Sequence, residues 1–260
     1  MKIQKKIAVV GATGRLGTHV ADILGAGGHD VVAISRSAGV DIISGEGLEA
    51  ALTDVDIIID ASSTPSPDQA EATEWFLASA RNLHAAGAKA GVARMVVVSI
   101  IGIDGSLAGY NAAKVAHEEA ALAGPVPTRI VRAAQFHEFV AQMLAWGTQG
   151  DVAYVPEMRT QLVAARAVAQ VLVDVALAES WDDVPAGAPF AEVAGPREET
   201  LAGAAEAIVA KRGDALKVVA VKDAAMNPDA EQFADGGLLP NAHATLAGPT
   251  FAEWLATAEV

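Results

Sequence analysis

Two side chains of the chain, Tyr110 and Lys114, can do acid–base chemistry together. They lie four positions apart in the segment YNAAK, and on a helix this spacing places both on one face. A free phenol has a pKa of about 10, but a nearby ammonium favours the phenolate and lowers that pKa. A group whose pKa lies nearer the working pH is the more effective proton donor or acceptor. The pair therefore predicts a catalytic site, with an exposed, merely stabilising helix pair as the alternative.

A serine precedes this pair at a position that suits ligand binding. Ser99 ends the apolar run Met95–Ser99, which we expect to be a strand. Ligands of open parallel sheets bind at the carboxyl ends of the strands. The loop between Ser99 and Tyr110 is short, so its residues, GIDGSLAGY, must bring the two hydroxyls together within that length.

A glycine turn near the start of the chain predicts a phosphate-binding site. Its glycines follow the apolar run Ile7–Val10 and open a helical pattern. Such glycines let the backbone turn tightly and approach a pyrophosphate, whose charge the helix N-terminus favours. No Gly-Lys-Ser/Thr ends the turn, which excludes a P-loop and leaves a dinucleotide site or an ordinary glycine turn. The expected contacts are Gly11, Thr13, Gly14, Arg15, Leu16 and Gly17.

The end of the next expected strand favours NADP over NAD. An NAD site carries an acidic residue there to bind the ribose 2′-hydroxyl, but this strand ends in Ser35, Arg36 and Ser37. The nearest acid, Asp30, precedes the strand. Arg36 and the two hydroxyls can instead bind a 2′-phosphate, with Arg15 on its other side. We therefore predict NADP (NADPH) as cofactor and NAD as the less favoured one; two solvated surface arginines are the alternative.

Two further groups of residues are weaker candidates. Ala61, Ser62 and Ser63 follow the apolar run Asp56–Asp60 and are expected to contact the cofactor, unless they form a plain serine-capped loop. Aromatic residues at helical spacing follow the run Thr128–Arg132, and they predict either an apolar substrate pocket or an ordinary core stripe. The pocket candidates are Gln135, Phe136, His137 and Phe139.

Only a parallel sheet would bring these segments together. Short runs rich in Val and Ile alternate with helical patterns, which is typical of strands buried on both faces. We therefore predict an α/β fold with a Rossmann-type doubly wound parallel sheet and right-handed crossovers. The expected strands are Ile7–Val10, Val31–Ser35, Asp56–Asp60, Met95–Ser99 and Thr128–Arg132, and the expected helices are Gly14–Ala26, Leu48–Thr53, Asp68–Gly91 and Tyr110–Ala123.

The pattern changes after Gln135. We predict a dinucleotide-binding core over residues 1–135 and a smaller C-terminal substrate-side lobe over residues 136–260, packed on the core as one continuous domain. The lobe should contain helices at Phe136–Trp146, Val163–Glu179 and Glu198–Arg212, strands at Val152–Val155, Phe190–Val193 and Lys217–Val221, a loop marked by Pro185, Gly187 and Pro189, and a final helix within Pro249–Ala258.

Composition excludes several other classes of function. A net charge of −14 argues against binding to nucleic acid or to an anionic membrane. No apolar run is long enough for a membrane span, and the chain has no cysteine for disulfides, thiol catalysis or thiolate metal sites. The histidines lack metal-binding spacing, so we predict no metal, and His117 is interpreted as an ordinary helix residue. These features favour a cytoplasmic protein whose partner is a small-molecule substrate.

The motifs GATGRLG and YNAAK together resemble the short-chain dehydrogenase/reductase superfamily. The segments MVVVSIIGID, RIVRAAQFHEFV and FAEVAGPREETL are similar to its atypical NmrA-like and isoflavone-reductase-like branch, and the likeness covers most of the chain. The resemblance implies a Rossmann fold and a bound nicotinamide cofactor. It also implies that Tyr110 protonates a carbonyl during hydride transfer, Lys114 binds the nicotinamide ribose and lowers the tyrosine pKa, and Ser99 orients the substrate oxygen.

Three functions follow from these motifs. The first is an NADPH-dependent reductase of a small apolar carbonyl, quinone or similar electrophile. The second is a non-catalytic, NADP(H)-sensing regulator of the NmrA-like type. The third is an NAD-dependent enzyme that acts on a nucleotide sugar, against which Arg15 and Arg36 argue. The oligomeric state stays open.

Overall fold

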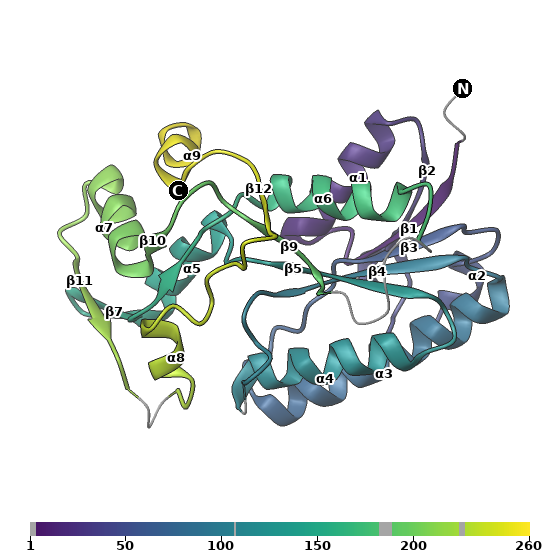
Figure 1. Cartoon of the computed structure of the whole chain (residues 1–260), viewed down its shortest axis with the longest axis horizontal. Coiled ribbons are helices and arrows are strands. Elements are labelled where there is room, and N and C mark those ends of the chain that lie inside the picture. The colour runs from purple at the N-terminus through teal and green to yellow at the C-terminus, as the bar shows by residue number, and fades with distance from the viewer. Residues whose placement is uncertain (1–3, 107, 182–188, 224–226) are drawn as a thin grey trace. The chain divides into compact units, whose positions relative to one another are not determined.

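A computed structural model describes residues 4–106, 108–181, 189–223 and 227–260. Within these ranges seven strands form one sheet in the order β12-β9-β5-β4-β3-β1-β2 (Figure 1). The strands are β1 (Lys6–Val10), β2 (Asp30–Ile34), β3 (Ile57–Asp60), β4 (Arg94–Ile100), β5 (Thr128–Ala133), β9 (Ala191–Ala194) and β12 (Thr245–Leu246). The predicted Rossmann-type α/β fold is confirmed.

The parallel pairing of this sheet places its chain reversals where a ligand can bind. β1 pairs in parallel with β2 on one side and with β3 on the other, and β3 pairs in parallel with β4. The strand order therefore reverses at β1. The chain moves from β1 to β2 on one side of the sheet, whereas β3 and β4 extend it on the other side. A crevice opens at such a switch point, outside the carboxyl ends of the strands.

Helices cover both faces of the sheet in its N-terminal part. α3 (Gln69–Ala90) and α4 (Gly109–Ala123) lie side by side on one face, and α1 (Arg15–Ala26) and α6 (Ala165–Leu177) lie on the other (Figure 1). Two shorter elements, the 3-10 helix η1 (Arg36–Ala38) and α2 (Leu48–Ala51), follow β2. α3 begins at Asp68, whose side chain accepts a hydrogen bond from the Glu71 N–H, and ends at Gly91 in the left-handed conformation.

Apolar packing between the sheet and the helices forms the core of this part. Val10, Ile34, Ile58 and Met95 of the strands are almost completely buried against Leu83 of α3. Continuous burial on both faces explains why the strands have unbroken Val and Ile runs instead of alternating patterns. This packing fixes the carboxyl ends of the strands, where the candidate residues lie.

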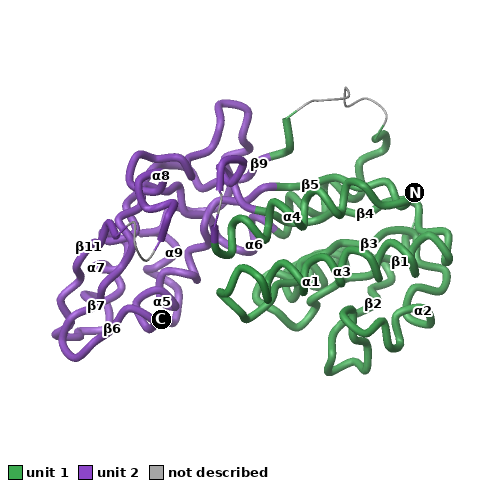
Figure 2. Tube along the Cα trace, turned by 90° about the horizontal axis from the view of Figure 1, so that it is seen from below, with its two compact units in different colours: residues 1–99, 109–131, 169–191 green, residues 100–108, 132–168, 192–260 purple. Residues whose placement is uncertain are grey.

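The chain forms two compact units, each built from separate segments (Figure 2). The first contains residues 1–99, 109–131 and 169–191, and the second contains residues 100–108, 132–168 and 192–260. Most of the expected substrate-side lobe, residues 136–260, lies in the second unit, but residues 169–191 return to the first. The chain therefore crosses between the units several times, not once near residue 135.

The second unit has small sheets of its own. A three-stranded sheet has the order β11-β7-β6 and a two-stranded sheet pairs β10 with β8. The elements are α5 (His137–Gly147), β6 (Thr148–Gln149), β7 (Val152–Pro156), β8 (Arg159–Thr160), β10 (Glu199–Thr200), α7 (Leu201–Arg212), β11 (Lys217–Val221), α8 (Ala230–Ala234) and α9 (Phe251–Thr257). The sequence patterns did not predict the two-residue strands or α8, because such short elements have too few residues for a period. Pro185 and Gly187 of the expected loop lie outside the described residues.

Candidate active site

The glycine turn lies at the switch point of the sheet. Gly11 follows β1 directly and has a φ of 74°, a left-handed conformation that suits glycine. Its N–H donates to the Ile34 carbonyl of β2 at 2.9 Å, and a Cβ built on it would lie 2.9 Å from the Cα of Ser62. The turn therefore fits between the ends of β2 and β3, where a larger residue would clash with backbone.

The same turn leaves the start of α1 open to a ligand. A Cβ on Gly17 would lie 2.1 Å from the Gly11 carbonyl oxygen, so only glycine lets the helix approach the turn this closely. The N-cap residue is Gly14, which has no side chain to accept hydrogen bonds from the first turn. A helix N-terminus of this kind attracts an anion. The cradle that a Cβ would fill thus fits a dinucleotide pyrophosphate.

Thr13 and Arg15 are exposed at this turn, whereas Leu16 is buried. Both polar side chains are thus accessible to a ligand at the start of α1, and Leu16 packs inward. The structure therefore gives the turn a polar outer side and an apolar base.

The residues expected to determine the specificity for NADP over NAD follow β2. Ser35 caps η1, its Oγ accepts from the Ala38 N–H at 3.3 Å, and it lies 3.0 Å from the Oγ of Ser37. Arg36 is exposed in the same short helix. Asp41, the next acid along the chain, accepts hydrogen bonds from the N–H groups of Ile43 and Ser44. The exposed groups directly after β2 are thus hydroxyls and a guanidinium.

A second polar loop follows β3. Ala61 donates its N–H to the Val10 carbonyl at 3.1 Å, which fixes the loop beside the glycine turn. Ser62 donates from its N–H and its Oγ to Oδ1 of Asp60, at 2.9 and 2.5 Å. Asp60 and Ser62 are buried, and their bonds to each other rigidify the loop.

The next serine contacts the candidate acid–base residue. The hydroxyls of Ser63 and Tyr110 lie 2.8 Å apart. Burial raises the pKa of Tyr110, an effect that the Ser63 hydrogen bond opposes and the charge of Asp60 reinforces. The pKa shift is opposite to the expected one, because no ammonium contributes to it. Tyr110 therefore holds its proton at neutral pH and is a weaker acid than a phenol in water.

Lys114 is deeply buried, and its ammonium points to α4 and to the sheet. Its Nζ donates to the Val98 carbonyl at 2.8 Å and lies 3.0 Å from Nδ1 of His117. It also lies 4.6 Å from the centre of the Phe76 ring, within range of a cation–π interaction. Burial lowers the pKa of Lys114 to about 8, although the charges of Asp60 and Glu118 act in the opposite direction.

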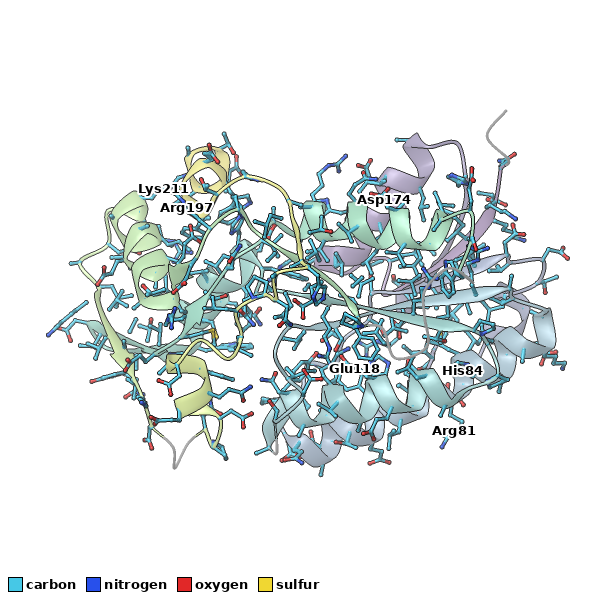
Figure 3. All side chains as sticks on the ribbon, viewed as in Figure 1. Arg81, His84, Glu118, Asp174, Arg197 and Lys211 are labelled. Carbon is cyan, nitrogen blue, oxygen red and sulfur yellow. The ribbon has the colours of Figure 1, made fainter. Side chains whose placement is uncertain are left out.

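His117 links this lysine to the end of β3. Its Nε2 lies 3.6 Å from Oδ2 of Asp60, and both side chains are almost inaccessible to solvent. Burial, together with the charge of Lys114, lowers the pKa of His117. Glu118, on the same helix (Figure 3), is the other acid whose charge acts on this group. Because burial and the Lys114 charge disfavour the imidazolium more than Asp60 favours it, His117 is neutral at neutral pH.

Ser99 lies near the end of β4 and is buried, and no described residue makes a hydrogen bond to its Oγ. The described partner of Tyr110 is Ser63 of the β3 loop. An unpartnered buried hydroxyl is unfavourable unless a ligand or water satisfies it. The Ser99 Oγ is therefore buried near the carboxyl end of β4 without a hydrogen-bond partner among the described residues.

Three residues of this cluster, Asp60, Phe76 and His117, were not predicted from the sequence as part of the site. Phe76 of α3 is fully buried and contacts the rings of both Tyr110 and His117. The spacing of Lys114 and His117, three positions apart on one helix face, was the available signal. Nothing in the sequence showed that the end of β3 would place a carboxylate against that face.

The expected pocket residues all lie in the second unit, where their contacts are mainly structural. The Thr160 hydroxyl donates to Oε1 of Gln135 at 2.5 Å, and Phe136 bridges to Val163. His137 is fully buried, and its ring packs against Phe251. Burial lowers the pKa of His137.

Phe139 has a different environment. It is partly exposed and meets the ring of Trp146 edge to face, at 6.1 Å between centroids. Trp146 is 62% exposed, which is high for a tryptophan. The outer side of α5 is thus apolar and accessible.

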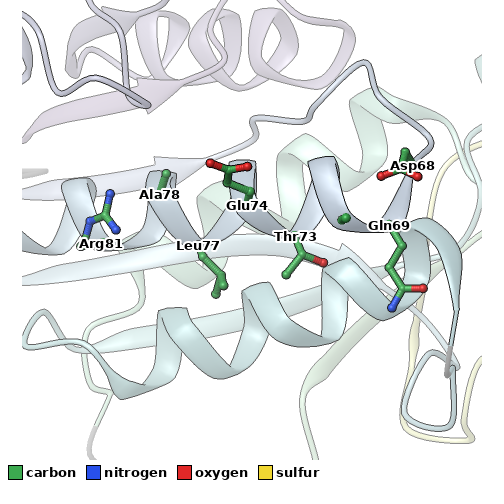
Figure 4. Close-up of a pocket in the computed structure, with 8 residues that line it drawn as sticks. Asp68, Gln69, Thr73, Glu74, Leu77, Ala78 and Arg81 are labelled. Atoms are coloured by element: carbon green, nitrogen blue, oxygen red, sulfur yellow. The ribbon is translucent and has the colours of Figure 1, made fainter.

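Other surface features do not point to a second catalytic centre. A broad depression runs along the outer side of α3 between Asp68 and Arg81 (Figure 4), and that one helix supplies nearly all of its lining. Among the described residues, no three His, Asp or Glu side chains are placed to hold a metal ion. No helix in the described ranges is both long and apolar enough to cross a membrane.

Comparison with known proteins establishes the fold. No family model matches the chain, and no curated protein sequence matches it. MoeE5 in complex with UDP-glucose and NAD has a TM-score of 0.72 and 17% identity, over 97% of this chain and 96% of that one. A short-chain dehydrogenase/reductase superfamily protein from Agrobacterium tumefaciens with bound NAD has a TM-score of 0.64 and 18% identity, over 96% and 95% of the two chains. The chain is similar in fold to this superfamily.

A third solved structure extends the likeness to a protein that holds the other cofactor. MlghC, a GDP-mannoheptose C4 reductase from Campylobacter jejuni with NADP bound, has a TM-score of 0.63 and 12% identity, over 85% of this chain and 88% of that one. Similar structures therefore contain NAD or NADP, and the likeness alone does not choose between them.

Proposed function

We propose that this protein is an NADPH-dependent oxidoreductase of the short-chain dehydrogenase/reductase type that reduces a small apolar carbonyl, quinone or similar electrophile. The observation that carries the proposal is the hydroxyl pair of Tyr110 and Ser63, 2.8 Å apart, in the first unit that also holds the glycine turn. The similar folds of proteins that hold NAD or NADP support a dinucleotide in that turn.

The glycine turn and the loop after β2 would hold the cofactor. The open start of α1 suits the pyrophosphate, and Arg36 with the hydroxyls of Ser35 and Ser37 suits a 2′-phosphate. Arg15, exposed at the start of α1, would bind the same phosphate. Ala61 and Ser62 would bound the site from the β3 side.

The reduction needs a hydride for carbon and a proton for oxygen. When bound, the nicotinamide supplies the hydride. Tyr110 Oη donates its proton to the substrate oxygen, and the Ser63 hydroxyl at 2.8 Å orients it. The unpartnered Ser99 hydroxyl would orient the same oxygen, and the Lys114 ammonium would bind the cofactor ribose.

The apolar nature of the substrate is an inference from the sequence. The segments MVVVSIIGID and RIVRAAQFHEFV resemble the NmrA-like branch, and that resemblance agrees with a small apolar substrate.

The alternative substrate is a nucleotide sugar, which MoeE5 holds in the similar structure. An NADPH-oxidation assay separates the two. The purified protein is tested with quinones, aromatic aldehydes and keto-sugar nucleotides, and we expect turnover of the first two classes. Turnover restricted to keto-sugar nucleotides would replace the proposed substrate, and binding of NADPH without any turnover would indicate a sensor.

Tyr110→Phe tests the catalytic role. We expect turnover to fall by about 10²- to 10⁴-fold, the usual contribution of a positioned proton donor. Tyr154→Phe is the matched control, because this tyrosine lies on β7 in the second unit and is 43% exposed. Unchanged turnover in both variants would show that Tyr110 is not the proton donor.

A further inference from the structure

A row of buried polar groups leads from the end of β3 through His117 to Lys114. We infer that Asp60 and His117 are positioning residues that set the orientation of the Lys114 ammonium. The inference rests on the proposed function, in which Lys114 binds the cofactor ribose. It assigns a role to a carboxylate–imidazole pair that the reaction itself does not use.

The hydrogen-bonding chemistry of the row allows only one tautomer of His117. A protonated lysine has N–H donors and no acceptor, so the Nδ1 that lies 3.0 Å from Lys114 Nζ must be the acceptor. The ring proton of the neutral imidazole is then on Nε2. Nε2 faces Oδ2 of Asp60 at 3.6 Å, where a carboxylate favours an N–H over a lone pair. Both neighbours of the ring therefore require the same tautomer.

Asp60 is held in place through its Oδ1 atom. Oδ1 accepts both hydrogen bonds from Ser62, whereas no described residue makes a hydrogen bond to Oδ2 within the usual range. Oδ2 is thus directed at His117 by a rigid loop. The carboxylate is buried at the carboxyl end of β3, so solvent does not screen it.

The ring itself is also fixed in its plane. It stacks on Phe76 of α3 with centroids 4.6 Å apart and planes 23° apart. The charged groups that face it are Asp60 from β3 and Lys114 and Glu118 from α4, and the contact from α3 is apolar. An imidazole held by stacking and by two polar neighbours cannot rotate to accommodate a displaced lysine.

The consequence concerns the three N–H bonds of the ammonium. One is donated to Val98 and one to His117, and the described residues provide no third hydrogen bond for Lys114. The third N–H therefore has a fixed direction. Removing the acceptor at His117 would free the ammonium to rotate. Even a small displacement of a group that positions the reactants lowers the reaction rate strongly.

Two substitutions of His117 separate positioning from packing. His117→Asn keeps an acceptor oxygen near the position of Nδ1 but loses the ring, whereas His117→Phe keeps the ring on Phe76 but loses the acceptor. We expect His117→Asn to retain most of the turnover number for NADPH oxidation. We expect His117→Phe to lose about ten- to a hundredfold. The reverse order would show that the ring acts only by packing.

Asp60→Asn tests the other end of the row. The amide oxygen can keep the bonds to Ser62, but its NH₂ group would face Nε2 and favour the opposite tautomer. Asp56→Asn is the matched control, because Asp56 precedes the same strand and bonds to Lys5 and Lys6. Nitrogen-15 NMR of the imidazole distinguishes the protonated from the unprotonated ring nitrogen without any turnover.

We expect the Nε2–H tautomer of His117 in the wild-type protein and in Asp56→Asn, and its loss in Asp60→Asn. His84, which contacts Ala121 and Val126, should keep its spectrum in all three. An Nδ1–H tautomer in the wild type, or an unchanged His117 in Asp60→Asn, would overturn the inference.

The two proposals fail in different ways. If wild-type protein turns over no tested substrate, the proposed function fails, and the tautomer measurement alone decides whether Asp60 and His117 hold Lys114. If turnover is lost on Tyr110→Phe but His117→Phe behaves like wild type, the proposed function stands and the positioning role is wrong.

Discussion

Lys114 offers the sharpest test of the arrangement, because burial of its ammonium has a measurable effect on stability. The perturbation is Lys114→Met, which replaces the charged end with an apolar group of similar length. In the folded protein, burial lowers the pKa of Lys114 from its ordinary 10.5 to about 8. The unfolded chain exposes the lysine to water, so its pKa there is the ordinary one.

The magnitude follows from linkage between proton binding and folding. Below pH 8 the folded and unfolded proteins both carry the proton, and above pH 10.5 neither does. Between these values only the unfolded chain binds the proton, so the free energy of unfolding rises with pH. The pKa difference corresponds to about 3 kcal/mol, at about 1.4 kcal/mol for each unit.

The assay is urea unfolding of wild type and Lys114→Met at several pH values from about 7 to about 10. We expect the stability of the wild type relative to the variant to rise by up to about 3 kcal/mol across this range. Subtracting the free energy of unfolding of the variant from that of the wild type at each pH removes the contribution of the groups that both proteins share. The absolute difference at neutral pH is not the test, because methionine also leaves the acceptors Val98 and His117 without their donor.

Lys89→Met is the matched control. Lys89 is 66% exposed on α3, where it pairs with Glu49, so its replacement removes a lysine without removing a buried charge. A constant difference for Lys114→Met would refute the argument. It would show that the ammonium of Lys114 is solvated and does not point into the protein.

Three further predictions concern the glycine turn, the cofactor and acid stability. Gly17→Ala should abolish dinucleotide binding in calorimetry and destabilise the fold, because the added Cβ would lie 2.1 Å from the Gly11 carbonyl oxygen. Gly25→Ala is the control in the same helix: no atom lies within 4 Å of its Cβ, so it should stabilise the protein by up to about 1 kcal/mol. Arg36→Ala should weaken NADP binding by about ten- to a hundredfold and leave NAD binding nearly unchanged, whereas equal wild-type affinities for the two cofactors would refute the NADP assignment. Burial lowers the pKa of His84 and of His137, so the free energy of unfolding should decrease as the pH falls below about 6.5, with proton uptake on unfolding measurable by titration; a flat profile there would contradict the burial of these rings.

Much of the fold could be predicted from the sequence, because local patterns specify it. The run Ile7–Val10 is apolar without a break, which is characteristic of a strand buried on both faces, and β1 has that environment. The glycines at positions 11 and 17 are required by the turn itself, so their spacing alone indicated a close approach of helix and strand. The short strands and α8 were not predictable, since tertiary contacts, not local periods, support them.

The amino-acid sequence by itself determined which chemical groups are available: the glycine turn, the hydroxyls and guanidinium after β2, and a tyrosine and lysine one helical turn apart. The tertiary structure decided how these groups are paired. It placed Ser63, from a loop that is distant in sequence, on the phenol of Tyr110, and it placed Asp60 opposite His117. These pairings depend on which strand ends the sheet brings beside α4, and burial there reverses the direction of the pKa shift that spacing alone predicted for the tyrosine.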